Sequence, residues 1–136
     1  MASFLIDTNV ISELRKTRPH GAVISWISNL RQDQIFVCAV SLGELQRGIE
    51  RTRRSDPVKA AQLETRLEQV ATAYNALAMD GTAFREWAGI MDMQSDDLLE
   101  DAMIAAIARV HRLTVATRNE ADFSVLKTPY LNPFKN

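Results

Sequence analysis

Residues 3–9 read Ser-Phe-Leu-Ile-Asp-Thr-Asn, so that a short apolar run ends directly in three polar residues. A short run of apolar, often β-branched residues that ends in a polar turn is typical of a buried β-strand. The same pattern recurs at four places further along the sequence. The further runs lie at residues 35–40, 76–79, 113–117 and, more weakly, 130–131. The sequence therefore predicts five short strands, most of them followed by a polar turn.

Between these runs, the apolar residues take the spacing of helices. In residues 57–75, Leu63, Leu67, Val70 and Tyr74 recur at near-helical spacing behind Pro57, a favourable first-turn residue. Because strands that are apolar on both faces alternate with helices, the predicted fold class is α/β, with a parallel sheet covered on both faces. Helices are predicted over residues 9–15, 22–30, 42–53, 57–75, 82–93 and 98–111, and a loop over the basic stretch 51–56.

Length and composition limit the class of protein. A chain of 136 residues is about one domain long, and 46% apolar with 24% charged residues is an ordinary globular composition, so we expect a single domain over residues 1–136. A net charge of −1 gives no global sign of nucleic-acid binding. No apolar run approaches the roughly 18 residues of a membrane span and the N-terminus lacks a basic signal-like start, so we expect a cytoplasmic protein without a membrane contact.

The few cysteine and histidine residues restrict the metal chemistry. Cys38 is the only cysteine, which excludes an intramolecular disulfide. Together with His20 and His111 it supplies too few ligands for a four-ligand zinc site. Any bound metal is therefore expected to be held by oxygen.

Four acidic residues lie near the ends of the predicted strands. Asp7 directly follows the first strand, and Glu44 lies one helical turn past the second. Asp101 opens the helix before the fourth strand, and Asp122 follows that strand. Ligands of open parallel sheets bind beyond the carboxyl ends of the strands, so these acids are expected to converge. Two carboxylates about 4 Å apart repel by roughly 4 kcal/mol at an effective dielectric constant near 20, and a bound cation such as Mg²⁺ or Mn²⁺ relieves that repulsion.

Three of these acids also have a structural interpretation. Ser41-Leu-Gly-Glu44 has the pattern of a capping box, in which Ser41 caps a helix and Glu44 bonds back to the cap amide. Asp7 and Asp122 are equally suited to cap the helices that follow them. From the residues alone, both interpretations stay open.

The acids around residue 100 also have both a structural and a functional interpretation. Residues 97–100, Asp-Leu-Leu-Glu, also have the form of a helix start, which gives Asp97 and Glu100 a capping role. Asp101 is then the acid without a cap partner, although helix-start electrostatics alone also account for it.

Four segments carry a resemblance to a known family. They are Phe-Leu-Ile-Asp-Thr-Asn-Val-Ile-Ser-Glu-Leu at 4–14, Val-Ser-Leu-Gly-Glu-Leu-Gln-Arg-Gly at 40–48, Asp-Ala-Met-Ile-Ala-Ala-Ile-Ala at 101–108 and Thr-Arg-Asn-Glu-Ala-Asp-Phe at 117–123. The sequence resembles the PIN-domain ribonucleases, close to the VapC- and FitB-type toxins of bacterial toxin–antitoxin pairs. The resemblance implies a Rossmann-like sheet of five parallel strands in the order 3-2-1-4-5.

The resemblance also implies a site and an activity. The activity is hydrolysis of an RNA phosphodiester by water bound to Mg²⁺ or Mn²⁺. The partners are the RNA substrate, a small antitoxin protein and a second copy of the chain in a homodimer. The implied acidic pocket consists of Asp7, Glu44, Asp101 and Asp122, with Asp7 and Asp101 as principal metal ligands and with Thr8 and Asn119 as supporting polar residues.

Basic and apolar residues outside the acids are candidate contact residues. Cations near the pocket can bind phosphate, although a charge run at a helix end is also typical of a solvated face. The basic candidates are Arg47, Arg51, Arg53 and Arg54, and also Arg15, Lys16 and Arg18. The apolar candidates for a dimer or antitoxin groove are Ile24, Trp26, Ile27 and Tyr74.

Three other functions compete with this interpretation. A receiver-type signalling domain also binds Mg²⁺ at strand ends, but it needs paired acids where Asp7 has no acidic neighbour. A phosphatase of the haloacid dehalogenase class needs Asp-x-Asp after the first strand, and Asn9 occupies the second position. A catalytically weak or inactive PIN domain would act only as a binding module, but it is expected to lack pocket acids.

Overall fold

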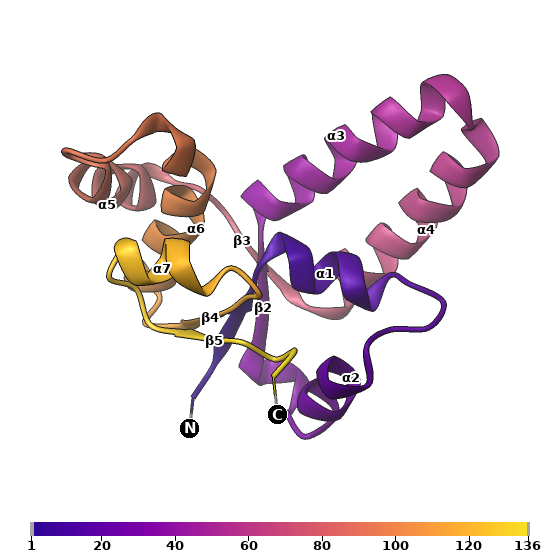
Figure 1. The fold of residues 1–136 in the computed structure, drawn as a ribbon, viewed down its shortest axis with the longest axis horizontal. Helices are drawn as coiled ribbons and strands as arrows, with labels where there is room; N and C mark the ends of the chain where they lie inside the picture. Colours follow the sequence, from indigo (N-terminus) through magenta and orange to yellow (C-terminus); the bar gives the residue numbers. More distant parts are fainter. Residues whose placement is uncertain (1, 136) are drawn as a thin grey trace.

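The sheet of the protein is parallel throughout. The structure, a computed structural model, describes residues 2–135. The strands are β1 (Phe4–Ile6), β2 (Ile35–Cys38), β3 (Asn75–Leu77), β4 (Thr114–Ala116) and β5 (Tyr130–Leu131). Each neighbouring pair is parallel and the order is β3-β2-β1-β4-β5 (Figure 1). The predicted α/β fold and its strand order are confirmed.

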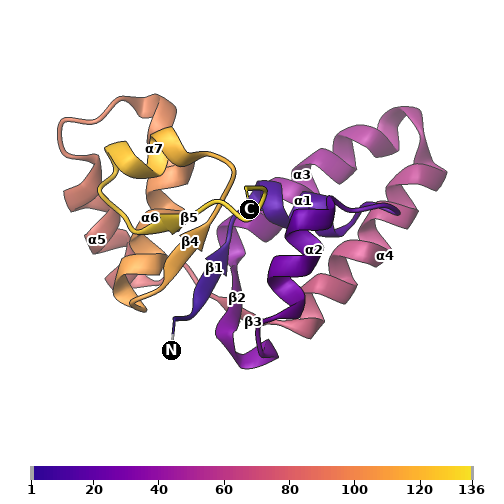
Figure 2. The same ribbon diagram turned by 60° about the horizontal axis from the view of Figure 1, so that its bottom comes forward.

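Helices cover both faces of this sheet. Helices α1 to α4 lie on one side and α5 to α7 on the other (Figure 2). Within residues 2–135, no helix combines the length and the apolar character that a membrane span requires. The helices are α1 (Thr8–Leu14), α2 (Gly21–Ser28), α3 (Ala39–Ser55), α4 (Pro57–Ala73), α5 (Gly81–Met91), α6 (Leu99–Val110) and α7 (Glu120–Val125), with short 3₁₀ turns at Gln32–Gln34 and Asp96–Leu98.

β1 is the central strand, and its side chains alternate between two cores. Leu5 packs in the core beneath α5, α6 and α7, where Phe123 also lies. Phe4 and Ile6 pack in the core beneath α1 to α4. Because both faces of the strand are buried, every residue in it is apolar, as central parallel strands require. Asp7 is the first residue after this run, and it stands at the carboxyl edge between β2 and β4.

The loop predicted over residues 51–56 is wrong, because α3 continues to Ser55. Arg53 forms ion pairs with Glu50 one turn earlier, at 3.0 Å, and with Glu64 of α4, at 3.1 Å. These contacts give the basic stretch partners within a helical hairpin, which the linear sequence does not reveal. Asp56 alone forms the turn, and its side chain caps α4.

Candidate active site

Asp7 is the most buried of the four predicted acids, with 3% of its surface exposed. Its backbone N donates to the carbonyl of Ala116 at 2.9 Å, which joins the end of β1 to β4. Its Oδ1 accepts from Thr8 N at 2.8 Å and so caps α1. Its Oδ2 accepts from Thr117 Oγ1 at 2.7 Å and from Asn9 Nδ2 at 3.2 Å. One oxygen therefore serves as a helix cap, while the other belongs to a polar cluster.

Glu44 reaches this cluster from α3. Thr8 Oγ1 donates to Glu44 Oε1 at 3.1 Å and lies 3.0 Å from Ser41 Oγ. The predicted capping box is wrong: β2 ends at Cys38 and α3 begins at Ala39, so Ser41 lies inside the helix and is fully buried. Because Ser41 does not occupy the cap position, Glu44 has no cap amide to bond and faces α1 instead.

Asp101 and Asp122 are joined by one amide. Asn119 Nδ2 donates to Asp101 Oδ2 at 3.0 Å and to Asp122 Oδ2 at 2.7 Å. Asp122 lies in the first turn of α7, whose N-cap residue is Asn119, so the cap interpretation of Asp122 is not realised. The structure thus brings together the four predicted acids and both supporting residues, Thr8 and Asn119.

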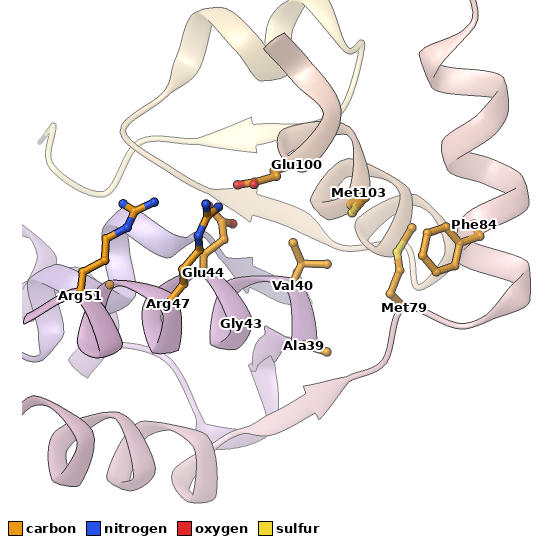
Figure 3. A pocket seen from close by; sticks show the side chains of 11 residues that line it. Ala39, Val40, Gly43, Glu44, Arg47, Arg51, Met79, Phe84, Glu100 and Met103 are labelled. Carbon is orange, nitrogen blue, oxygen red and sulfur yellow. The ribbon is translucent and has the colours of Figure 1, made fainter. Parts of the chain in front are cut away.

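The capping roles predicted for Asp97 and Glu100 are also wrong. Ser95 caps the 3₁₀ turn by accepting from Asp97 N at 3.3 Å, and α6 then begins at Leu99 without a side-chain cap. Glu100 is left free of a structural role at the helix start. It faces Glu44 across the site (Figure 3), and this proximity contributes to the raised pKa of Glu44.

Thr117 is a site residue that the sequence reasoning missed. It is fully buried directly after β4. Its Oγ1 donates to Asp7 and accepts from Asn119 N at 2.9 Å, and Asn9 Nδ2 lies 3.3 Å away. Asn9 Oδ1 in turn accepts from Arg118 N at 3.1 Å. The signal that identifies Thr117 is positional, because it is the first polar residue after the strand that neighbours β1.

The electrostatics of the cluster disfavour further negative charge. Burial and a hydrogen bond shared with Glu100 raise the pKa of Glu44 to about 7. Burial and a hydrogen bond shared with Asp122 raise the pKa of Asp101 to about 7. Burial also raises the pKa of Asp7, against the lowering effect of the bond from Thr117. Burial and crowding therefore disfavour the charged forms of Asp7, Glu44 and Asp101.

Comparison with known proteins assigns this arrangement to a family, because the family described as PIN domain matches residues 4–128. The chain belongs to the PIN-domain family. It is 31% identical over 137 residues to toxin FitB of Neisseria gonorrhoeae, covering 96% of this chain and 97% of that protein. It is also 31% identical over 138 residues to VapC ribonuclease Y4jK of Sinorhizobium fredii, covering 96% and 97%. The crystal structure of FitAcB from Neisseria gonorrhoeae matches with a TM-score of 0.85 at 29% identity, covering 98% of this chain and 99% of that chain.

Membership in the PIN-domain family confirms the resemblance found in the sequence. It excludes the receiver-type and dehalogenase-type alternatives, which belong to other families.

One acid of the cluster, Glu44, lines a cavity of about 590 Å³ in this PIN domain. Glu44 and Glu100 lie in its middle, with Arg47 and Arg51 further along α3 (Figure 3). The prediction that basic residues flank the pocket is thus correct for these two arginines. It is wrong for Arg53, which pairs with Glu50 and Glu64, and for Arg15 and Lys16, which line a second cavity beside α1, α2 and α4.

Proposed function

We propose that residues 1–136 form a single PIN domain that acts in the cytoplasm as a metal-dependent endoribonuclease, the toxin of a toxin–antitoxin pair. The observation that carries this proposal is the polar cluster in which acids from four distant parts of the chain meet at the carboxyl edge of β1. Thr8, Thr117 and Asn119 join these acids through hydrogen bonds. The relatives named as a VapC ribonuclease and as toxin FitB support the reaction and the biological role.

The donor set fits a hard divalent cation. Its ligand atoms are all oxygens, as Mg²⁺ and Mn²⁺ prefer, and its carboxylates repel one another unless a proton or cation lies between them. Within residues 2–135, no three His, Cys, Asp or Glu side chains stand close enough to enclose an ion without adjustment. Asp7 and Asp101 are proposed as the principal ligands, and Glu44 and Asp122 as ligands that act directly or through waters.

Each residue of the cluster then has a task in hydrolysis. A bound Mg²⁺ or Mn²⁺ would lower the pKa of water and stabilise charge on the phosphate oxygens. Thr117 holds one oxygen of Asp7, and Asn119 orients Asp101 and Asp122, so the carboxylates keep their positions without metal. Glu44 or Asp122 is placed to orient the attacking water.

A second surface supports a protein partner. The cavity beside α1, α2 and α4 measures about 540 Å³, and Ile24, Ile27 and Tyr74 line it as predicted, whereas Trp26 packs edge-to-face on Phe4 at 5.1 Å. A groove that combines these apolar residues with the basic residues Arg15 and Lys16 suits a segment of a small antitoxin. An arginine of the same partner can pair with the acidic cluster and exclude the metal, because its planar fork binds carboxylates with two hydrogen bonds. We also propose a homodimer.

The direct test incubates the purified protein with a mixed RNA pool, with Mg²⁺, with Mn²⁺ and with a chelator, and maps the cut ends. We expect cleavage with either ion and none with the chelator, because the acids alone repel the phosphate. Failure to cut any RNA in the presence of both ions would contradict the proposal. Equal cleavage with the chelator would contradict the metal dependence alone.

The raised pKa values of Glu44 and Asp101 lead to a pH-dependent effect of metal on stability. Folding disfavours their charged forms, so their contribution to stability is present below the pKa values of the unfolded chain and is lost as the pH rises through about 7. A divalent ion stabilises the charged forms. We therefore expect Mg²⁺ to raise the melting temperature clearly at about pH 8 and little at about pH 5.5.

Thermal unfolding at matched ionic strength measures this effect. Asp101→Asn serves as the control, because it removes one of the two titrating acids and is expected to reduce the response at the higher pH. An equal response to Mg²⁺ at both pH values would contradict the prediction.

A further inference from the structure

The cavity at the acidic cluster has an end that the proposed hydrolysis does not use. Beyond Glu44, its wall is formed by Val40, Met79, Phe84 and Met103, which come from α3, the segment after β3, α5 and α6 (Figure 3). These side chains carry no charge, so they cannot bind metal or phosphate. The wall nevertheless belongs to the same cavity as Glu44 and Glu100.

Phe84 gives this wall an accessible aromatic ring. The residue is 45% exposed, although most of the large apolar residues of the protein are buried. Its ring contacts Trp87 edge-to-face, with centroids 6.0 Å apart, and Trp87 Nε1 donates to the carbonyl of Leu99 at 3.2 Å. Phe84 is therefore held against a side chain that α6 fixes in place, and it keeps a large accessible surface.

The other end of the cavity is basic. Val40, Glu44, Arg47 and Arg51 follow one another along α3 at spacings of three or four residues, so they share one face of the helix over about 16 Å. Within residues 2–135, neither Arg47 nor Arg51 takes part in an ion pair, unlike Arg53 on the same helix. Their guanidinium groups are available for an anion.

The order of chemistry along the cavity is thus basic, acidic and apolar. A single-stranded RNA presents matching groups: phosphates for arginines, a scissile phosphodiester for a metal held by acids, and the flat face of a base for an aromatic ring. A protein partner would need both carboxylates opposite the arginines and apolar side chains opposite the wall, whereas an RNA strand carries a phosphate and a flat ring in every nucleotide. The sequence of charges therefore favours a nucleotide as the occupant.

We propose that the apolar end of the cavity is a subsite for one unpaired base of the RNA substrate, stacked on Phe84, while phosphates on the other side of the acids bind Arg47 and Arg51. This inference rests on the proposed ribonuclease function and adds a determinant of substrate choice to it. Only an unpaired base can stack there, so the subsite selects single-stranded RNA and a fixed distance between the stacked base and the cut.

The test combines variants of Phe84 with variants of the RNA. The substrates are a short single-stranded RNA that the wild type cuts and a series of the same RNA with one abasic position each. Phe84→Leu keeps the wall apolar but removes the ring, whereas Phe84→Trp keeps a ring. Val125→Ala changes a side chain on α7 that is 53% exposed and lies outside the cavity, and serves as the control.

We expect Phe84→Leu to raise KM about tenfold at nearly unchanged kcat, and Phe84→Trp and Val125→Ala to stay close to the wild type. One abasic position should raise the KM of the wild type by a similar factor and leave that of Phe84→Leu unchanged, because the stacking is already lost. Arg47→Gln should lower the salt dependence of KM. It should not change which abasic position in the RNA raises KM.

Three outcomes would overturn the subsite. One is a Phe84→Leu protein with wild-type KM, and another is a Phe84→Leu protein that responds to every abasic position as the wild type does. The third is a Phe84→Leu protein whose oligomeric state, measured by light scattering, differs from that of the wild type. Such a change would show that the wall is a contact between subunits. A wild type that cuts no RNA would instead refute the proposed function, so the two failures are distinguishable.

Discussion

Replacing Asp101 by Asn is expected to lower kcat/KM for RNA cleavage by roughly a hundredfold or more at saturating Mg²⁺. Asn is nearly isosteric with Asp but lacks the charge that a metal ligand supplies. The fold should survive, because the carboxylate lies near Asp122 and burial already raises its pKa to about 7. The melting temperature without metal should therefore stay the same or rise at about pH 8. Cleavage assays and thermal unfolding on the same preparation measure both effects.

Asp97→Asn is the matched control for this variant. Asp97 is exposed and belongs to the 3₁₀ turn just before α6. Its replacement by Asn therefore removes one negative charge near Asp101 without changing an acid of the cluster. We expect nearly wild-type cleavage from it. Wild-type cleavage by Asp101→Asn, or an equal loss in both variants, would show that Asp101 is not a ligand.

Expression of the wild-type chain in bacteria is expected to stop growth, and the Asp7→Asn chain is expected to be harmless. Asp7 is the most buried acid of the cluster and bonds to Thr8 and Thr117, so its loss removes one of the two proposed principal ligands. Co-expression of the gene encoded beside this one should restore growth, because its product is proposed to cover the acidic cluster. Growth curves after induction, with protein levels measured in parallel, provide the readout.

Two results would contradict this prediction. One is normal growth with abundant soluble wild-type protein and no neighbouring gene. The other is a wild-type chain that purifies as a stable monomer and stays fully active beside the co-expressed neighbour.

The fold was predictable because its three central strands, β1, β2 and β4, are largely buried on both faces. A central strand such as β1 is apolar at every position, and the run ends at Asp7, where the chain leaves the sheet. The strand order is less accessible to this reasoning, because hydrophobic patterns do not say which strands are neighbours. It came from the resemblance of motifs that span the whole chain.

The site was predictable where a polar residue follows a strand, and Glu100 shows where this reasoning fails. Residues 97–100 match a capping pattern, and only the position at which α6 begins shows that Ser95 does the capping instead. The run at 35–40 has the same ambiguity, because the apolar residues Ala39 and Val40 continue past the end of β2 and conceal the true start of α3. Element boundaries depend on tertiary packing, and the roles of Ser41 and Glu100 depend on those boundaries.

Thr117 was missed for a different reason. Its importance comes from contacts with Asp7, 110 residues earlier in the chain, and with Asn119. The predicted strand over residues 113–117 included Thr117, so the sequence did not show that this residue follows the strand, and its role arises only from the pairing of β1 with β4.

The central position of β1 also governs when the protein becomes active during its own synthesis. The strand is made first, yet one of its two neighbours is β4, which begins at Thr114, and Asp122 comes later still. A ribosome that has translated only the first hundred residues holds a chain with Asp7 and Glu44 but without the strand and the acids that complete the cluster. Products that stop before Thr114 therefore lack the assembled acidic cluster, and the activity proposed for it requires that translation has passed Asp122.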